Sequence, residues 1–274
     1  KNRMPELPEV ETTRRGIEPH INHQTINDVV VRNHALRWPI PKQLRQKIRK
    51  QQVQSVDRRG KYLLIILETG TVIIHLGMSG SLRICTASTV VEKHDHVDFI
   101  FGNKKILRLR DPRRFGAVLW TAKDPAKHKL LSSLGPEPLE ESFNSHYLFE
   151  QTRKRSASIK SLIMNSHIVV GVGNIYACES LFLAGINPKR KAGSLSPARC
   201  EKLVSAIKQV LAQSITQGGT TLRDFIRENG EPGYFAQRLF VYGKTGEPCA
   251  RCGKPIKQIT QQQRSTFYCP GCQH

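Results

Sequence analysis

Four cysteines near the C-terminus have the spacing of a metal site. Cys249 and Cys252 form one CxxC pair, and after sixteen further residues Cys269 and Cys272 form a second pair. Each pair can hold a metal ion in a tight turn, and two pairs complete the tetrahedral thiolate shell of structural zinc. A closed shell of four sulfurs leaves no position for a substrate. We therefore predict one structural Zn²⁺ in a ribbon over residues 246–274.

The remaining cysteines show no comparable pattern. Cys85, Cys178 and Cys200 bring the total to seven, and an odd number argues against a complete disulfide framework. A thiolate metal site is typical of a reducing compartment. We expect a cytoplasmic protein whose three other thiols have no chemical role.

The balance of charge indicates a polyanionic partner. The 274 residues include 43 Lys and Arg against 22 Asp and Glu, which gives a net charge of +21. Such an excess attracts nucleic acid or an anionic surface, and it does not by itself choose among DNA, RNA and a membrane surface. No stretch approaches the roughly 20 consecutive apolar residues of a membrane span.

The elements that would position these residues fall into two groups. Apolar, β-prone runs at residues 62–67, 71–76, 96–101 and 106–109 form two hairpins and predict an antiparallel sandwich. After a polar, Pro- and Gly-containing stretch, helical periodicity recurs at residues 147–153, 159–165, 175–184 and 197–217. We predict an α+β protein with a β-sandwich domain at 5–130, flanked by helices, a helical domain at 131–245 and a zinc finger at 246–274.

A series of ordered motifs extends along nearly the whole chain. They are MPELPEVET at 4–12, KYLL at 61–64, HLGMSG at 75–80, DPRRFG at 111–116, GVGNIYA at 171–177, GGTTLRDF at 218–225 and PGYF at 232–235. Together with the zinc module, they closely resemble the bacterial formamidopyrimidine-DNA glycosylase family. The resemblance implies a helix–two-turn–helix in the helical domain. It also implies an enzyme of base excision repair, without a nucleotide cofactor.

The resemblance further implies a glycosylase and abasic-site lyase that acts on 8-oxoguanine and formamidopyrimidines in double-stranded DNA. Its catalytic residues would be Pro5 as the nucleophile, Glu6 as the general acid and base, and Lys61 on a phosphate beside the lesion. An α-amino group has a pKa near ~8, so a useful fraction is unprotonated at neutral pH. The Schiff base it forms would allow β,δ-elimination.

The same resemblance assigns DNA contacts to seven other residues. His75 would contact the backbone, and Met78, Arg113 and Phe115 would fill the gap left by the everted base. Lys160 and residues 220–234 resemble the region that covers this base. Asn174 and Arg264 would hold the phosphates around the lesion. We expect a monomer that works on duplex DNA with oxidised purines or abasic sites, without membrane association.

Residues 1–4 depart from this pattern. While Lys1 to Met4 are attached, the Pro5 nitrogen is an amide and cannot be a nucleophile, so we expect translation from Met4 and removal of Met4. Two alternatives stay open. An endonuclease VIII-like glycosylase would prefer oxidised pyrimidines, although Leu7 and DPRRFG argue against it. A non-catalytic protein that binds lesions would be favoured if residues 1–4 are retained.

Overall fold

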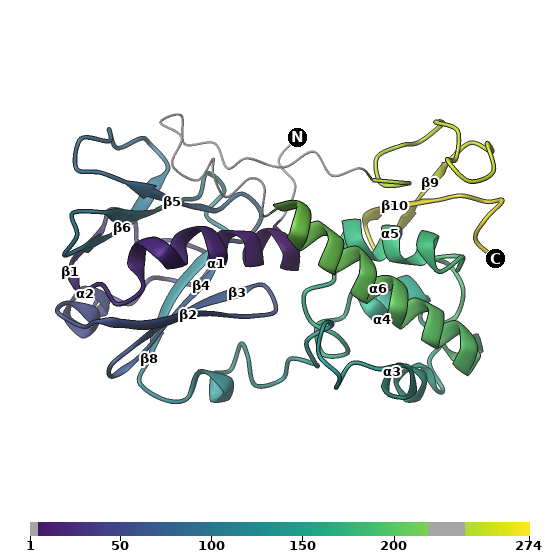
Figure 1. Ribbon diagram of the computed structural model, residues 1–274, viewed down its shortest axis with the longest axis horizontal. Helices are drawn as coiled ribbons and strands as arrows, with labels where there is room; N and C mark the ends of the chain where they lie inside the picture. The colour runs from purple at the N-terminus through teal and green to yellow at the C-terminus, as the bar shows by residue number, and fades with distance from the viewer. Residues whose placement is uncertain (1–4, 219–238) are drawn as a thin grey trace. The chain divides into compact units, whose positions relative to one another are not determined.

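The computed structural model describes residues 5–218 and 239–274 (Figure 1). These residues form two compact units, one of residues 5–132 with 217–218 and one of residues 133–216 with 239–274. Each unit has its own apolar core and is described by itself. In the described part of the chain, no helix has both the length and the apolar character needed to cross a membrane.

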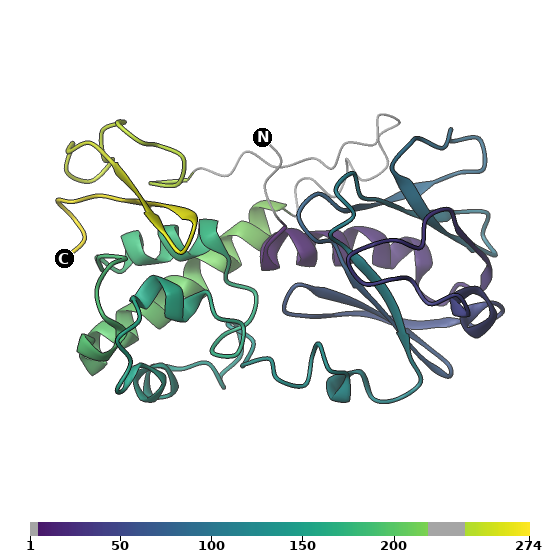
Figure 2. The same cartoon turned by 180° about the vertical axis from the view of Figure 1, so that it is seen from behind.

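The first unit contains two four-stranded antiparallel sheets. One has the order β1 (Ile26–Val31), β6 (Asp95–Phe101), β7 (Ile106–Arg110) and β5 (Ser81–Cys85). The other has the order β2 (Val53–Arg59), β3 (Tyr62–Leu67), β4 (Gly70–His75) and β8 (Ala117–Thr121). Figure 2 shows both sheets from behind. The predicted antiparallel sandwich is confirmed.

Three helices accompany the sheets: α1 (Leu7–Ile21), the short α2 (Leu44–Ile48) and the 3-10 turn η1 (Pro125–Lys127). α1 lies against β2, β3 and β5 (Figure 1). Its apolar side chains Val10, Ile17 and Ile21 are almost fully buried in the core that the two sheets share. Burial of this face, worth roughly 1.5–3 kcal/mol for each large apolar side chain, holds the helix in place.

The second unit is helical. It contains α3 (Ser145–Thr152), α4 (Ile159–Ile163), α5 (Asn174–Leu183), the 3-10 turn η2 (Ala192–Ser194) and all but the last two residues of α6 (Pro197–Gly218). Side chains cap two of the helix starts: Asn144 Oδ1 accepts from the Tyr147 N–H at 2.9 Å, and Ser158 Oγ, just before α4, accepts from the Ser161 N–H at 3.3 Å. Such caps satisfy N–H groups that have no partner inside the helix.

The zinc module of this unit is a hairpin of β9 (Lys257–Gln261) and β10 (Arg264–Tyr268). Gln262 and Gln263 have φ angles of 46° and 60°, as expected at the two central residues of a type I′ turn. The module packs a small apolar cluster against Cys178 and Phe182 of α5. Its core is therefore too small to stand without additional bonds.

A buried carboxylate fastens the chain entering the module to α5. Glu179 is 2% exposed and accepts the backbone N–H groups of Phe240, Val241 and Tyr242 at 2.7–2.9 Å. Burial raises its pKa, and the three N–H donors act in the opposite direction. Glu179 therefore fixes the start of the zinc module relative to α5.

Candidate active site and zinc centre

The four predicted cysteines converge on one point. Their sulfurs all lie within 4.8 Å of one another, with 3.8 Å between Cys249 and Cys272 and 3.4 Å between Cys252 and Cys269. A Zn–S bond of about 2.3 Å in a tetrahedron places sulfurs about 3.8 Å apart. The donor set and its dimensions fit one Zn²⁺, as the sequence predicted. Because all four positions come from the protein, the metal is structural.

Local hydrogen bonds prepare one of these thiols for the metal. Burial raises the pKa of the Cys249 thiol, but hydrogen bonds outweigh burial and lower the pKa to about 7; they come from the backbone N–H groups of Arg251 and Cys252 and from the thiols of Cys269 and Cys272. The Arg251 N–H lies 3.4 Å from Cys249 Sγ. A lowered pKa favours the thiolate form of Cys249, which is the form that binds a metal ion.

In the first unit, two of the residues predicted to carry out the chemistry, Pro5 and Glu6, immediately precede α1. Glu6 occupies the cap position, is 1% exposed, and donates its backbone N–H to Glu9 Oε2 at 2.9 Å. Pro5 is also buried. The start of α1 is therefore an ordered, enclosed place in the unit, where helix N–H groups favour negative charge.

An ionic cluster fastens α1 to the β2–β3 hairpin. Arg58 donates Nε–H to Glu11 Oε2 at 3.0 Å and Nη1–H to the Gly60 carbonyl at 2.9 Å. One turn further along α1, Arg14 donates to the Val56 carbonyl at 3.0 Å. Arg14 thus contacts Val56, whereas Glu11, which is nearer the start of α1, contacts Arg58, which is nearer the turn of the hairpin. The N-terminus of α1 is thus directed to the sheet end where Lys61 immediately precedes β3.

Strand register brings two other predicted segments to this end. Tyr62, next to Lys61, pairs with His75 at the end of β4, and His75 pairs with Ala117 at the start of β8. HLGMSG therefore follows β4, and DPRRFG precedes β8, at the same edge of the sheet. Motifs up to 55 positions apart become neighbours because the strands between them are antiparallel.

His75 has a defined protonation state. Burial, followed by the positive charges of Lys61 and Arg37, lowers its pKa to about 4. Its Nδ1 accepts the Gly77 N–H at 3.0 Å, so the proton of the neutral ring is on Nε2. The ring lies 4.8 Å from that of Tyr62, measured between centroids. His75 can therefore donate one hydrogen bond to a phosphate oxygen without carrying a charge.

The three residues expected to replace the everted base lie on two adjoining loops. Met78 is half-buried in the loop after β4, while Arg113 and Phe115 are exposed in the loop before β8. The Arg113 guanidinium lies 4.7 Å from the centre of the Phe115 ring, a cation–π contact. A phenylalanine that is 41% exposed has the apolar surface needed to contact stacked bases.

The second unit brings Lys160, Asn174 and the zinc hairpin together. Lys160 Nζ donates to Asn174 Oδ1 and to Thr266 Oγ1, both at 2.6 Å, and Asn174 Nδ2 donates to the Ser265 carbonyl at 2.9 Å. Arg264, which begins β10, is exposed. The resemblance places Lys160 among the DNA contacts, but this side chain is only 2% exposed. Its ammonium orients Asn174 and joins α4, α5 and β10, and the DNA contact stays a prediction.

Sequence reasoning missed several residues on which this arrangement depends. Glu11, Arg58, Ser79 and Asp111 organise the first unit, and Glu179 organises the second. Each lies in or beside a recognised motif, so a signal existed, but their partners are far away in the sequence. The loop at 220–234, which the resemblance assigns to the everted base, lies outside the described residues.

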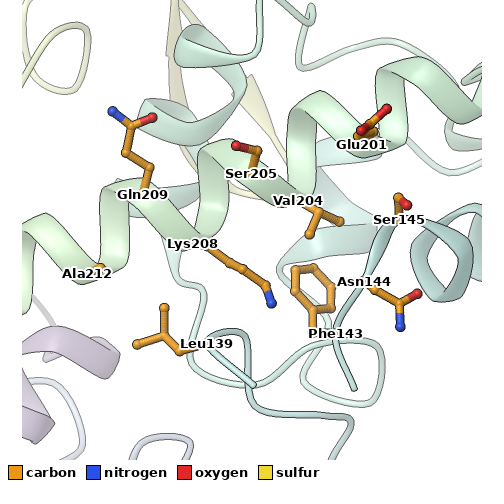
Figure 3. Close-up of a pocket in the computed structure, with 10 residues that line it drawn as sticks. All are labelled: Leu139, Phe143, Asn144, Ser145, Glu201, Val204, Ser205, Lys208, Gln209 and Ala212. Carbon is orange, nitrogen blue, oxygen red and sulfur yellow. The ribbon is translucent and has the colours of Figure 1, made fainter. Parts of the chain in front are cut away.

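A separate pocket of about 600 Å³ lies on the helical unit (Figure 3). It is lined by residues of α6 and of the 139–145 segment, and Lys208 extends into it from α6 with Leu139 and Phe143 nearby. Lys208 Nζ donates to the Glu140 carbonyl at 2.8 Å. None of the predicted site residues lines this pocket.

Comparison with known proteins identifies the family. Three family models match: the formamidopyrimidine-DNA glycosylase N-terminal domain over residues 4–118, its H2TH domain over 134–226, and a zinc finger found in FPG and IleRS over 246–274. A formamidopyrimidine-DNA glycosylase of Marinobacter nauticus is 56% identical over 270 residues, which cover 98% of this chain and 100% of that protein.

Solved structures agree as well. The Lactococcus lactis enzyme bound non-covalently to DNA with an abasic site matches with a TM-score of 0.87 at 33% identity, over 98% of this chain and 99% of that one. The same enzyme with DNA containing N7-benzyl-Fapy-dG matches with a TM-score of 0.89 at 34% identity and the same coverage.

A β-sandwich unit, an H2TH unit and a four-cysteine zinc finger define a class of DNA glycosylases with abasic-site lyase activity. Within that class, the chain belongs to the formamidopyrimidine-DNA glycosylase family. The endonuclease VIII-like and non-catalytic alternatives are not favoured by any of these matches.

Proposed function

We propose that this enzyme excises 8-oxoguanine and formamidopyrimidines from duplex DNA and then cleaves the abasic site by β,δ-elimination. The observation that carries the proposal is the convergence of the α1 start, Lys61 and His75 at one sheet end, through the Arg58 contacts and the strand register. The relatives' DNA complexes, with an abasic site and with a Fapy lesion, support this substrate class.

In the proposed first step, the Pro5 nitrogen attacks C1′ of the damaged nucleotide and forms the N–C1′ bond as the bond between C1′ and the base breaks. The base leaves with the electron pair of that bond and takes up a proton, and the Pro5 nitrogen loses its own N–H proton. Glu6 transfers a proton for opening of the sugar ring, and the nitrogen and C1′ then share an iminium. This cation accepts the electron pair left when C2′ loses a proton, so the 3′ phosphate departs. A second elimination releases the 5′ phosphate, and hydrolysis frees Pro5.

Other residues hold the DNA in this proposal. Lys61 contacts a phosphate beside the lesion, and the neutral His75 donates from Nε2 to the backbone. Asn174 and Arg264 hold phosphates from the second unit, and Lys160 acts through Asn174. Met78, Arg113 and Phe115 occupy the space of the everted base, which offsets the cost of unstacking. We also propose the three-part division at 5–130, 131–245 and 246–274, which the extents of the matched models support.

Borohydride trapping tests the chemistry, because reduction of the iminium leaves protein covalently attached to DNA. Protein shown by intact mass to begin at Pro5 should form the adduct with 8-oxoguanine duplexes and yield β,δ-elimination products. Pro5→Gly should trap far less, and Glu6→Gln should fail to excise the base. Full activity from protein that retains Lys1 to Met4 would refute the proline mechanism.

The same experiment separates the alternatives. Preferential trapping on thymine glycol would indicate a pyrimidine-specific enzyme. Tight binding without any adduct, from protein that begins at Pro5, would indicate a non-catalytic lesion-binding protein.

A further inference from the structure

The loop after β4 (residues 76–80) and the loop before β8 (residues 111–116) are packed backbone against backbone. A Cβ placed on Gly77, where φ is +64°, would lie 2.5 Å from the Phe115 carbonyl carbon. A Cβ on Gly116 would lie 2.8 Å from the His75 carbonyl oxygen. Both distances are shorter than carbon atoms tolerate, so only glycine permits this approach.

The buried carboxylate of Asp111 lies where the two loops meet. Asp111 is 0% exposed; its Oδ1 accepts the Ser79 hydroxyl at 2.8 Å and its Oδ2 accepts the Gly116 N–H at 2.8 Å. The Ser79 oxygen in turn accepts the Arg113 N–H at 3.1 Å. One hydroxyl thus connects the loop that carries Met78 to the loop that carries Arg113 and Phe115.

Backbone contacts hold the second loop from its other sides. The Arg37 N–H donates to the Arg114 carbonyl at 2.8 Å, and the His96 ring contacts the Asp111 carbonyl at 2.9 Å. Arg114 has a φ of +58°, an uncommon conformation for a side chain of this kind. The backbone is therefore held firmly while the side chains of Arg113 and Phe115 stay exposed.

We propose that Ser79 and Asp111 are positioning residues that join the two loops into one rigid wedge for displacement of the damaged base. The proposal rests on the proposed function, in which Met78, Arg113 and Phe115 fill the vacated space. Neither Ser79 nor Asp111 need touch the DNA. Their effect is to fix Met78 relative to Arg113 and Phe115 before DNA binds. The three side chains can then enter the base stack together, and the two loops lose no conformational entropy when they do so.

The test compares Ser79→Ala with wild type in single-turnover reactions, using protein that begins at Pro5. On 8-oxoguanine opposite cytosine, Ser79→Ala should slow base excision by about tenfold, the effect expected when a buried hydrogen bond no longer holds the reactive geometry. Cleavage of a preformed abasic site should change by less than about twofold, because no base has to be displaced. Ser88→Ala, an exposed serine of the same unit, should match wild type on both substrates.

A further substrate distinguishes a positioning role from general destabilisation of the protein, because destabilisation would slow excision on every substrate alike. When 8-oxoguanine lies opposite an abasic analogue, no base pair has to be broken and no orphaned base remains. The deficit of Ser79→Ala should then shrink to about twofold or less. If Ser79→Ala is poorly folded, Asp111→Asn is the second variant, and its thermal unfolding is measured to establish that it folds. It should also lose activity on 8-oxoguanine opposite cytosine and much less on the other two substrates.

The outcomes are distinct. If wild type excises 8-oxoguanine and Ser79→Ala does so equally fast, the wedge proposal is wrong while the proposed function stands. Equal losses on intact lesions and preformed abasic sites would show a structural role only, and also overturn it. If wild type excises no oxidised purine, the proposed function fails and the wedge proposal fails with it.

Discussion

Several polar residues of the candidate sites are buried and form hydrogen bonds with other protein groups. Lys160, Asp111 and Glu6 are each no more than 2% exposed, and each makes hydrogen bonds within its own unit. Burying such groups is costly unless partners are supplied, so their presence marks positions where orientation matters. At the scale of the residue, the sites consist of exposed side chains held by buried ones.

His75 should make the stability of the first unit depend on pH. Its pKa is about 4 in the folded protein against an ordinary 6.5, so between these values the unfolded chain binds the proton and the folded chain does not. Folding stability contributed by neutral His75 is therefore present above about pH 6.5 and lost as pH falls toward 4.

We expect wild type to lose about 2 kcal/mol more than His75→Asn between about pH 7 and about pH 5. Urea unfolding of both proteins at the two pH values measures this difference. Because all other groups are shared, parallel losses in the two proteins would contradict the assignment to His75.

At the scale of the element, helix α1 depends on one carboxylate. Glu11 accepts hydrogen bonds from Arg14 and Arg15 of its own helix and from Arg58 of β2. Burial raises its pKa, but these arginines outweigh burial and hold the pKa below the ordinary 4.5. The charged form of Glu11 thus fastens the helix that follows Pro5 and Glu6 to the hairpin that carries Lys61.

Glu11→Gln should lower the free energy of unfolding by about 2 kcal/mol at neutral pH, the usual worth of hydrogen bonds to a buried charge. Because the folded pKa is lowered, the contribution exists above about 4.5 and is lost as pH falls through the folded value. Denaturant unfolding should therefore show wild type and variant converging in acid.

Glu18→Gln is the matched control. Glu18 Oε2 forms an ion pair with Arg14 Nη1 at 2.9 Å, and the Glu18 side chain is 37% exposed. Its effect should stay below about 1 kcal/mol. A Glu18 effect as large as that of Glu11 would argue against the role of the buried cluster.

At the scale of the whole molecule, the zinc module should unfold separately when the metal is removed. Its apolar cluster is small, so binding of Zn²⁺ supplies much of its folding free energy. A strong chelator, or Cys252→Ser, should raise hydrogen exchange over residues 246–274 and lower affinity for duplex DNA. Exchange in β3 and β4 should not change.

The control is Cys200→Ala, which lies outside the module and should keep one zinc per chain by elemental analysis. DNA affinity should return when zinc is restored to the chelated wild type. Unaltered DNA binding by fully zinc-free protein would show that the module is dispensable.

The excess of 21 positive charges should appear as salt-dependent DNA affinity. Cations that bind phosphates release counterions, so affinity falls as salt rises. Arg264→Ala should reduce the slope of log affinity against log salt by about 1. Lys202→Ala, an exposed lysine of α6, should leave the slope unchanged. Fluorescence anisotropy with a duplex containing a stable abasic analogue measures both slopes.

In the two four-stranded sheets, sequence patterns located both central strands of each sheet and missed both edge strands of each. β3, β4, β6 and β7 lie inside their sheets and have long apolar runs, because neighbours and the core cover them. The missed strands β1, β2, β5 and β8 are the four edges. They include exposed or polar positions such as Asp28 and Arg58, which conceal the alternation on which sequence-based assignment depends.

The sequence by itself determined the zinc ligands and the family, because CxxC spacing and ordered motifs are local and require no knowledge of the fold. Only the tertiary structure decided that the buried Lys160 donates a hydrogen bond to Asn174 and that Asp111 accepts one from Ser79. It also decided the protonation of His75, which follows from burial beside Lys61 and Arg37. Pairings between distant segments, and the desolvation they cause, arise from the packing of the whole sheet, which no short stretch of sequence encodes.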